Sequence, residues 1–354
     1  MGEELQKRYK RIDNKRRLIL LSLLIVDILL IIVCLCVGSA NLSLSQILQG
    51  FFNTGEHKYY LIVWKIRMPR VIAAVLAGGG LAISGLIMQS VLKNPMASPS
   101  TLGVSNAAVF GANFAIIVLG MGAFNSSAES DLFVNNPYFV ATTALIFAVI
   151  SVGLILILSH IKRFSSEIVV LAGLAVGAIF TAGTTMVQFF ADSNQLSSAV
   201  FWSFGNLARA TFLEDLIMFI VIATSFIFFM FNRLNYDAMT AGLDTARTMG
   251  VNTKSLSILS LLFASLITAT CVSFLGIIGF IGLIAPHIIK RFIGDNHRFL
   301  IPASFLSGVA ILLIADTISR TIVSGLSLPV GAITSLLGGP MFIYLLIRGK
   351  QKNA

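Results

Sequence analysis

The polar residues of this sequence that could do chemistry are few, and the most conspicuous are arginines at the ends of apolar runs. Arg67-Met-Pro-Arg70 opens one run, and Asp316 and Arg320 lie four residues apart near the end of another. Side chains four apart on a helix can pair, so Asp316 can fix the direction of Arg320. Because arginine pairs with carboxylates in a bidentate manner, these arginines indicate a docking site for an acidic partner, or else anchors in lipid headgroups.

The other polar residues favour no enzymatic chemistry. The chain has no G-K-[ST] phosphate-binding motif and no nucleophile–base set. Cys34, Cys36 and Cys271 lie in apolar runs without metal or redox spacing, which is typical of small buried side chains. Asp27 is a lone carboxylate without an obvious cationic partner and favours a packing or lateral contact, and His287 favours a structural role. We therefore expect no catalytic residue, no metal site and no cofactor in this chain.

Composition indicates that lipid is the solvent for most of the chain. The 354 residues are 56% hydrophobic and only 11% charged, with a mean hydropathy of +0.91. Soluble domains carry roughly 25% charged residues, which this chain cannot supply. The net charge of +10 comes from cations in short loops between apolar runs, so it indicates membrane topology rather than nucleic-acid binding.

Ten apolar runs are predicted to cross the bilayer, each near the length of about 20 residues that a helical span needs. The runs are continuous rather than alternating, which favours helices over a β-barrel. They cover residues 18–38, 69–90, 101–121, 138–160, 167–190, 212–231, 255–275, 277–292, 299–319 and 329–347. The eighth is short and contains Pro286. The predicted fold class is therefore an all-α polytopic membrane protein with about ten transmembrane helices.

The distribution of cations orients these spans, because cytoplasmic loops carry an excess of Lys and Arg. If the N-terminus lies inside, most of the 25 Lys and Arg residues fall in inner segments. The cations that fall outside are Lys58, Lys65, Arg67, Arg70, Arg209 and Arg320. Both termini are therefore predicted to be cytoplasmic, in a multi-pass protein of the cell membrane, and the docking role would explain why three arginines break the rule.

Small residues and prolines mark possible parts of a transport path. The second span contains Gly78, Gly79, Gly80 and Gly85, and the fifth contains Gly173, Gly177 and Thr181. Small residues four apart allow close helix packing, or leave width along a pore. Asn94-Pro95-Met96-Ala97-Ser98-Pro99 interrupts the chain at the predicted inner face, as an ordinary turn or as a gate.

The inner segment 232–254 is the longest polar connection after the N-terminal tail. Gly242, Ala246 and Gly250 recur every four residues, next to Asp244 and Arg247. Helical spacing would place the three small residues on one face. Such a face predicts either a partner surface outside the membrane or a solvated connector.

These motifs together resemble the permease subunits of type II ABC importers for iron–siderophores, haem and cobalamin. The resemblance runs from Trp64 to Arg348. It rests on Arg67-Met-Pro-Arg70, Asn94-Pro95-Met96-Ala97 with Pro99, Leu102-Gly103-Val104, Gly242/Ala246/Gly250, Gly279-Phe-Ile-Gly-Leu-Ile-Ala-Pro-His287, Ala315-Asp316, Leu328-Pro329-Val330-Gly331 and Gly338-Gly-Pro340. It implies a dimer with an identical or paralogous permease, two separate cytoplasmic ATPases that bind the ATP, and an extracytoplasmic substrate-binding protein.

The basic start of the chain is predicted to be a cytoplasmic tail at 1–17, which is not part of the resemblance. One transmembrane permease domain is predicted at 18–348, followed by a cytoplasmic tail at 349–354. The resemblance implies an ATPase coupling loop at 236–252 and assigns roles to individual residues. Arg67, Arg70 and Arg320 would meet the binding protein. The coupling residues would be Gly242, Ala246, Arg247 and Gly250. The gates and path would include Asn94, Met96, Ser165, Ser166, Gly173, Gly177 and Thr181.

The predicted function is ATP-driven import of an iron chelate, a ferric siderophore, by alternating access. Haem or cobalamin is the alternative cargo within the same family. The alternative from another class is a secondary transporter driven by an ion gradient. That class needs intramembrane carboxylates or broken-helix ion sites in paired halves, whereas the sequence offers only Asp27 and Asp316 and no visible inverted repeat.

Overall fold

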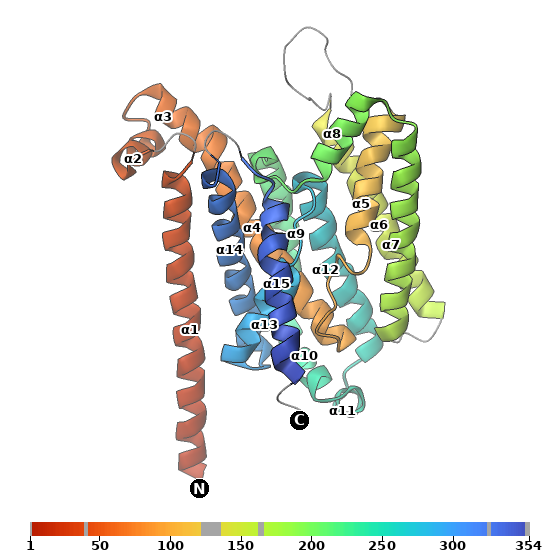
Figure 1. The fold of residues 1–354 in the computed structure, drawn as a ribbon. Helices are drawn as coiled ribbons and strands as arrows, with labels where there is room; N and C mark the ends of the chain where they lie inside the picture. Colours follow the sequence, from red (N-terminus) through yellow and green to blue (C-terminus); the bar gives the residue numbers. More distant parts are fainter. Residues whose placement is uncertain (1, 39–41, 122–135, 162–165, 324–326, 351–354) are drawn as a thin grey trace.

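The computed structural model describes residues 2–38, 42–121, 136–161, 166–323 and 327–350, and most of these lie in helices (Figure 1). The only β contact in this part of the chain is an isolated bridge between Phe204 and Ile277. The elements are α1 (Gly2–Cys36), α2 (Leu44–Phe52), α3 (His57–Leu61), η1 (Ile62–Arg67), α4 (Met68–Leu92), α5 (Val104–Asn113), η2 (Phe114–Val118), α6 (Pro137–Ile161), α7 (Ser166–Phe189), α8 (Ser193–Ser203), η3 (Leu207–Arg209), α9 (Phe212–Phe231), α10 (Arg233–Ala241), α11 (Leu243–Thr248), α12 (Thr253–Leu275), α13 (Ile281–Ile293), α14 (His297–Thr321) and α15 (Val330–Lys350).

The all-α fold class is confirmed, and each predicted span coincides with a helix. Within the described residues, seven helices are long and apolar enough to cross a membrane. They are Lys10–Cys36, His57–Leu92, Pro137–Leu158, Ser166–Phe189, Phe212–Phe231, Thr253–Leu275 and His297–Thr321. The other three predicted spans correspond to the shorter α5–η2, α13 and α15. The number ten is therefore approximate, because α5–η2 and α13 cover less than the usual span length and only Val330–Tyr344 of α15 is counted as a shorter apolar stretch.

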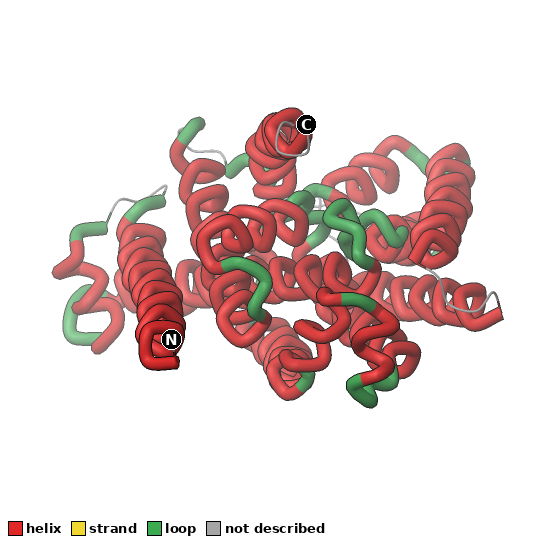
Figure 2. Tube along the Cα trace, turned by 90° about the horizontal axis from the view of Figure 1, so that it is seen from below, coloured by secondary structure: helices red, strands yellow, loops and turns green. Residues whose placement is uncertain are grey.

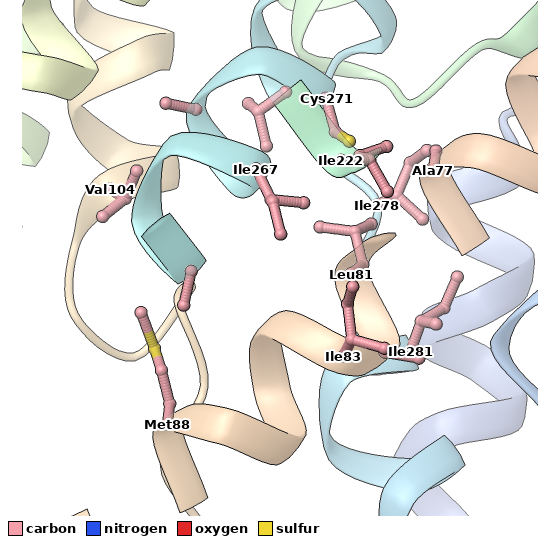
Figure 3. Packing of buried hydrophobic residues seen from close by; sticks show 14 of the residues in the cluster. Ala77, Leu81, Ile83, Met88, Val104, Ile222, Ile267, Cys271, Ile278 and Ile281 are labelled. Carbon is pink, nitrogen blue, oxygen red and sulfur yellow. The ribbon is translucent and has the colours of Figure 1, made fainter. Parts of the chain in front are cut away.

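Helix α4 lies at the centre of the bundle, where it contacts α9, α12, α13 and α14. Its glycines allow this packing: a Cβ on Gly78 would lie 2.5 Å from the carbonyl oxygen of Gly308, and a Cβ on Gly85 would overlap the carbonyl group of Gly282. Figure 3 shows apolar side chains of this core, contributed by α4, α5, α9, α12, the start of α13 and the segment before it. The glycines of the second span are thus packing residues, as small residues between membrane helices commonly are.

Helix α1 stands at the edge of the bundle and packs along α14 (Figures 1 and 2). It is one continuous helix from Gly2, so the basic segment before the first span is helical as well. At the end of this basic segment, the Arg16 Nε donates to the Ile293 carbonyl oxygen at 2.9 Å. Asp27 is buried, and neither carboxylate oxygen has a hydrogen-bond partner among the described residues, in line with the prediction that it lacks a cationic partner.

The bundle has two distinct ends. The end that holds Arg67, Arg70 and Arg320 carries α2 and α3 and is called the arginine end. The opposite end, called the coupling end, holds α10 and α11, and the described ends of the chain lie on this side (Figure 1). Termini on one side of the bundle agree with an even number of spans.

Candidate functional site

The loop that follows α4 at the coupling end is held in a fixed shape by its own side chains. Lys93 adopts a left-handed conformation (φ +48°) that ends α4. The Asn94 side-chain oxygen then accepts the Met96 backbone N–H at 2.9 Å, and the Thr101 hydroxyl donates to the Ser98 carbonyl oxygen at 2.7 Å. Asx and Ser/Thr turns of this kind replace helix hydrogen bonds where prolines prevent a helix. The predicted gate is thus a structured loop rather than a solvated linker.

A cavity of about 640 Å³ brings together two predicted gate residues that lie far apart in sequence. Asn94 from the loop and Ser166 from the start of α7 both line it. The remaining lining residues are Leu92, Lys93, Glu167, Val170 and Leu171. Met96 does not line this cavity and is 46% exposed, and Ser165 lies outside the described residues. The cavity lies beside the end of α4, where opening or closing would change access between α4 and α7.

Two of the three path residues predicted on α7 face inward in this structure. Gly173 and Gly177 are buried against the backbone of Leu102 and Gly103. The Asn106 side-chain amide spans the same contact and donates to the Gly177 carbonyl oxygen at 3.3 Å and the Thr181 hydroxyl at 3.1 Å. Both glycines therefore allow α7 to approach the Leu102–Gly103 turn, which is the packing alternative of the sequence analysis. Thr181 is exposed beside them.

At the arginine end, the side chains of the predicted docking arginines are largely buried inside the protein. Arg67 is 4% exposed and Arg70 is 7% exposed. The Arg70 Nε donates to the Asp316 carboxylate at 2.8 Å, and the Arg320 Nη2 lies 2.9 Å from the other Asp316 oxygen without the angle of a hydrogen bond. The predicted Asp316–Arg320 pair is confirmed, and the same buried carboxylate also draws Arg70 inward.

The same arginines satisfy backbone carbonyl groups at the end of α1. The Arg67 Nη1 donates to the carbonyl oxygens of Leu35 and Cys36, and the Arg320 Nη1 donates to those of Cys34 and Val37. The last four carbonyl groups of a helix lack partners within it, and cations favour this negative end of the helix dipole. Burial of these charges is thus tied to a structural task.

Arg209 performs the same task for α8. Its guanidinium donates to the carbonyl oxygens of Phe201 and Trp202 at 2.7 and 2.8 Å. Burial lowers the pKa of the Arg209 guanidinium to about 10, so it remains charged at neutral pH. Three of the arginines on the predicted outer side therefore terminate helices, namely Arg67, Arg209 and Arg320.

The coupling segment differs from its prediction in one respect. Gly242 (φ +150°) separates α10 from α11, and Gly250 (φ +83°) lies beyond the end of α11. Ala246 is fully buried. The prediction that these three residues share one helical face is therefore wrong, because glycine at positive φ ends regular helix on both sides of Ala246. Arg247 is exposed and pairs with Asp244 at 3.2 Å.

The outward face of α11 and its flanks is instead formed by larger side chains. Leu243 is 36% exposed, and Met249 is 68% exposed. Asp244 and Arg247 lie between them in sequence and are both exposed. An apolar patch with a polar rim outside the spans is typical of a protein contact surface.

Sequence reasoning missed three polar residues that meet near this segment. Asp237 of α10, His297 of α14 and Ser90 of α4 form a hydrogen-bonded chain. The residues are 60 and 207 positions apart in sequence, so no local pattern joins them. The only sequence signal is that His297 and Asp237 are polar residues at the boundaries of apolar runs.

Comparison with known proteins identifies the family. A model of the FecCD transport family matches residues 23–348. The chain belongs to this family. The match makes this FecCD protein a membrane permease of an ABC importer, and it decides between the two transporter classes that the sequence left open.

Relatives of this FecCD permease cover nearly its whole length. It is 45% identical to a Methanocaldococcus jannaschii protein named as a candidate ABC transporter permease, over 98% of each chain. It is 33% identical to the hemin transport system permease protein of Yersinia pestis, over 92% of this chain and 96% of that one. A solved structure described as a metal-chelate type ABC transporter shares the fold, with a TM-score of 0.81 at 24% identity over 93% of this chain and 99% of that chain.

Proposed function

We propose that this FecCD permease carries a ferric siderophore through the membrane. The observation that carries the proposal is the family match over residues 23–348. Relatives named for Fe(3+)-citrate and iron(3+)-hydroxamate import are 33% and 32% identical. Haem and cobalamin remain alternatives, since relatives named for hemin and vitamin B12 are 33% and 31% identical. The ligand that the cognate binding protein retains on purification distinguishes these cargoes.

The transport cycle needs partners that supply energy and form the rest of the path. We place the coupling end, with both termini, in the cytoplasm, where two ATPase subunits contact α11 and its flanks. A second permease subunit, identical or paralogous, completes the path. The exposed small residues on α7, Ala178, Thr181 and Thr185, support a path along this helix, and the cavity at Asn94 and Ser166 supports a cytoplasmic gate there.

Met249→Asp tests the ATPase contact. Met249 is exposed beside α11, so a charge should weaken ATPase binding without changing the permease core. Uptake into proteoliposomes should fall by about tenfold or more. The reason is that burying an unpaired charge in an interface costs about 2 kcal/mol or more. Ile12→Asp is the matched control, because Ile12 is an exposed apolar residue of α1, outside both proposed contact surfaces. Normal ATPase co-purification and uptake with Met249→Asp would count against this surface.

The binding protein is proposed to dock at the arginine end. Arg67, Arg70 and Arg320 supply three positive charges close to the single negative charge of Asp316, which leaves a net charge of +2. Because the guanidiniums are buried, they act through their electrostatic field on an acidic surface rather than by direct pairing in this state.

Arg67→Gln should therefore weaken association with the cognate binding protein several-fold at low salt, with a smaller effect at high salt. Lys254→Gln is the control, because it removes one exposed positive charge at the coupling end, on the other side of the bundle. Binding would be measured on permease–ATPase complexes whose unfolding temperature has been checked, so that lost docking is separated from lost capping of α1. Salt-independent binding of the unaltered complex would contradict the docking proposal.

A further inference from the structure

Three side chains from three helices form a continuous hydrogen-bonded chain at the coupling end. His297 Nδ1 lies 2.7 Å from the Asp237 carboxylate, which also accepts the His297 backbone N–H at 2.9 Å. His297 Nε2 lies 2.8 Å from the Ser90 hydroxyl oxygen. His297 is only 2% exposed. The Asp237 carboxylate contacts both the ring and the backbone N–H of His297, so the orientation of the His297 imidazole depends on α10.

An acid, a histidine and a serine in this order also occur in hydrolases, but here the serine is not available as a nucleophile. The Ser90 hydroxyl lies 3.0 Å from the Leu86 carbonyl oxygen, to which it can donate, as well as near the imidazole. Its single proton has two acceptors within the protein, and His297 is buried. A nucleophile needs an open reacting position beside it. The contact therefore joins helices rather than attacking a substrate.

Helix α10 makes a second buried contact through the neighbouring residue. The Tyr236 hydroxyl lies 2.7 Å from the Ser260 hydroxyl on α12, and the Tyr236 ring is 5.6 Å from that of His297. Burial raises the pKa of the Tyr236 phenol, which keeps its O–H intact for this bond. Consecutive residues of α10 thus hold α12 and α14, and His297 extends the connection to α4.

The hydrogen-bonded side chains of Asp237, His297 and Ser90 connect the proposed ATPase surface with the proposed gate. Helix α10 leads through Gly242 into α11, which carries the exposed patch. Ser90 lies in the last turn of α4, four residues before Asn94, which lines the gate cavity. A displacement of α10 therefore acts through one buried imidazole on the turn that enters the gate.

We propose that Asp237, His297 and Ser90 are positioning residues that couple movement of the ATPase-contacting segment α10–α11 to the gate at the end of α4. The inference rests on the proposed function and adds the residues that transmit the movement. It requires hydrogen-bonding groups at all three positions, because an apolar contact would let α10 move without turning the end of α4.

The test uses the full complex of permease, ATPases and binding protein in proteoliposomes, with cargo uptake and ATP hydrolysis measured together. Ser90→Ala should lower uptake per ATP hydrolysed by about tenfold, within the 5- to 150-fold range of coupling energies, while hydrolysis continues. Ser90→Thr, which keeps a hydroxyl, should restore most of the ratio. Ser273→Ala is the matched control, since the Ser273 hydroxyl is buried without a hydrogen-bond partner among the described residues.

A fluorescent label at Met96→Cys provides a second readout, because Met96 is an exposed residue of the gate loop. The ATP-dependent change in the fluorescence of this label should disappear in Ser90→Ala and Asp237→Asn and persist in Ser273→Ala. An unchanged uptake-to-hydrolysis ratio in Ser90→Ala, or a parallel loss of uptake, hydrolysis and thermal stability, would overturn the inference. If the unaltered complex neither assembles nor transports, the proposed function fails instead.

Discussion

Asp316→Asn should lower the free energy of unfolding by about 3–5 kcal/mol, the usual cost of removing one partner from a buried ion pair. Asp316 is fully buried and lies 2.8 Å from Arg70 and 2.9 Å from Arg320. Without its charge, two guanidiniums with side chains 8% exposed lose their compensating carboxylate. The Arg320 contacts that terminate α1 should weaken at the same time, because Asp316 no longer fixes the guanidinium.

Thermal unfolding of the purified permease in detergent measures this effect. Asp215→Asn is the matched control, since Asp215 is also buried but neither of its oxygens has a hydrogen-bond partner among the described residues. Removing an unpaired buried charge should leave the unfolding temperature unchanged or raise it. Equal destabilisation by both substitutions would show that the loss comes from placing an amide in the core and not from breaking the arginine pairs.

Gly85→Ala should prevent the permease from accumulating in its folded form. A Cβ at this position would overlap the backbone carbonyl of Gly282, and backbone cannot turn away as a flexible side chain can. Helices α4 and α13 would have to separate where their backbones are in contact, which we expect to cost about 4 kcal/mol or more. Fluorescence-detected size-exclusion chromatography of the membrane extract would report the folded fraction.

Gly153→Ala on α6 controls for the loss of a helical glycine as such. A Cβ there meets nothing within 4 Å, so the change should be neutral or stabilising by up to about 1 kcal/mol through helix propensity. A folded, monodisperse Gly85→Ala protein with the yield of Gly153→Ala would contradict the close α4–α13 packing.

The sequence was sufficient for the features that depend on neighbouring residues or on local composition. Hydropathy located the spans because the need to satisfy backbone groups in lipid acts on each run separately. The spacing of Asp316 and Arg320 predicted their pair because residues four apart share a helix face. The polar, proline-rich composition of 94–99 likewise predicted the interruption after α4.

Features that depend on packing between distant segments could not be predicted in the same way. Arg70 finds Asp316 across 246 residues, and nothing in either neighbourhood indicates that the arginine is buried. The four-residue spacing of Gly242, Ala246 and Gly250 suggested a helix, but backbone conformation at the two glycines interrupted it. Whether a glycine turns, packs or lines a path depends on what lies opposite, as Gly177 against Gly103 shows.

The termination of α1 by arginines from elsewhere in the chain has a consequence for the order of biogenesis. The carbonyl oxygens of Cys34 and Val37 receive Arg320, which the ribosome adds 286 and 283 residues later. The first span to enter the membrane is therefore among the last to reach its final contacts. Until α14 is inserted, the carbonyl oxygens of Cys34 and Val37 must rely on water or lipid headgroups, whereas Arg67 can already reach those of Leu35 and Cys36. Chains that stop before Arg320 contain the first helix but lack one of the two arginines that terminate it.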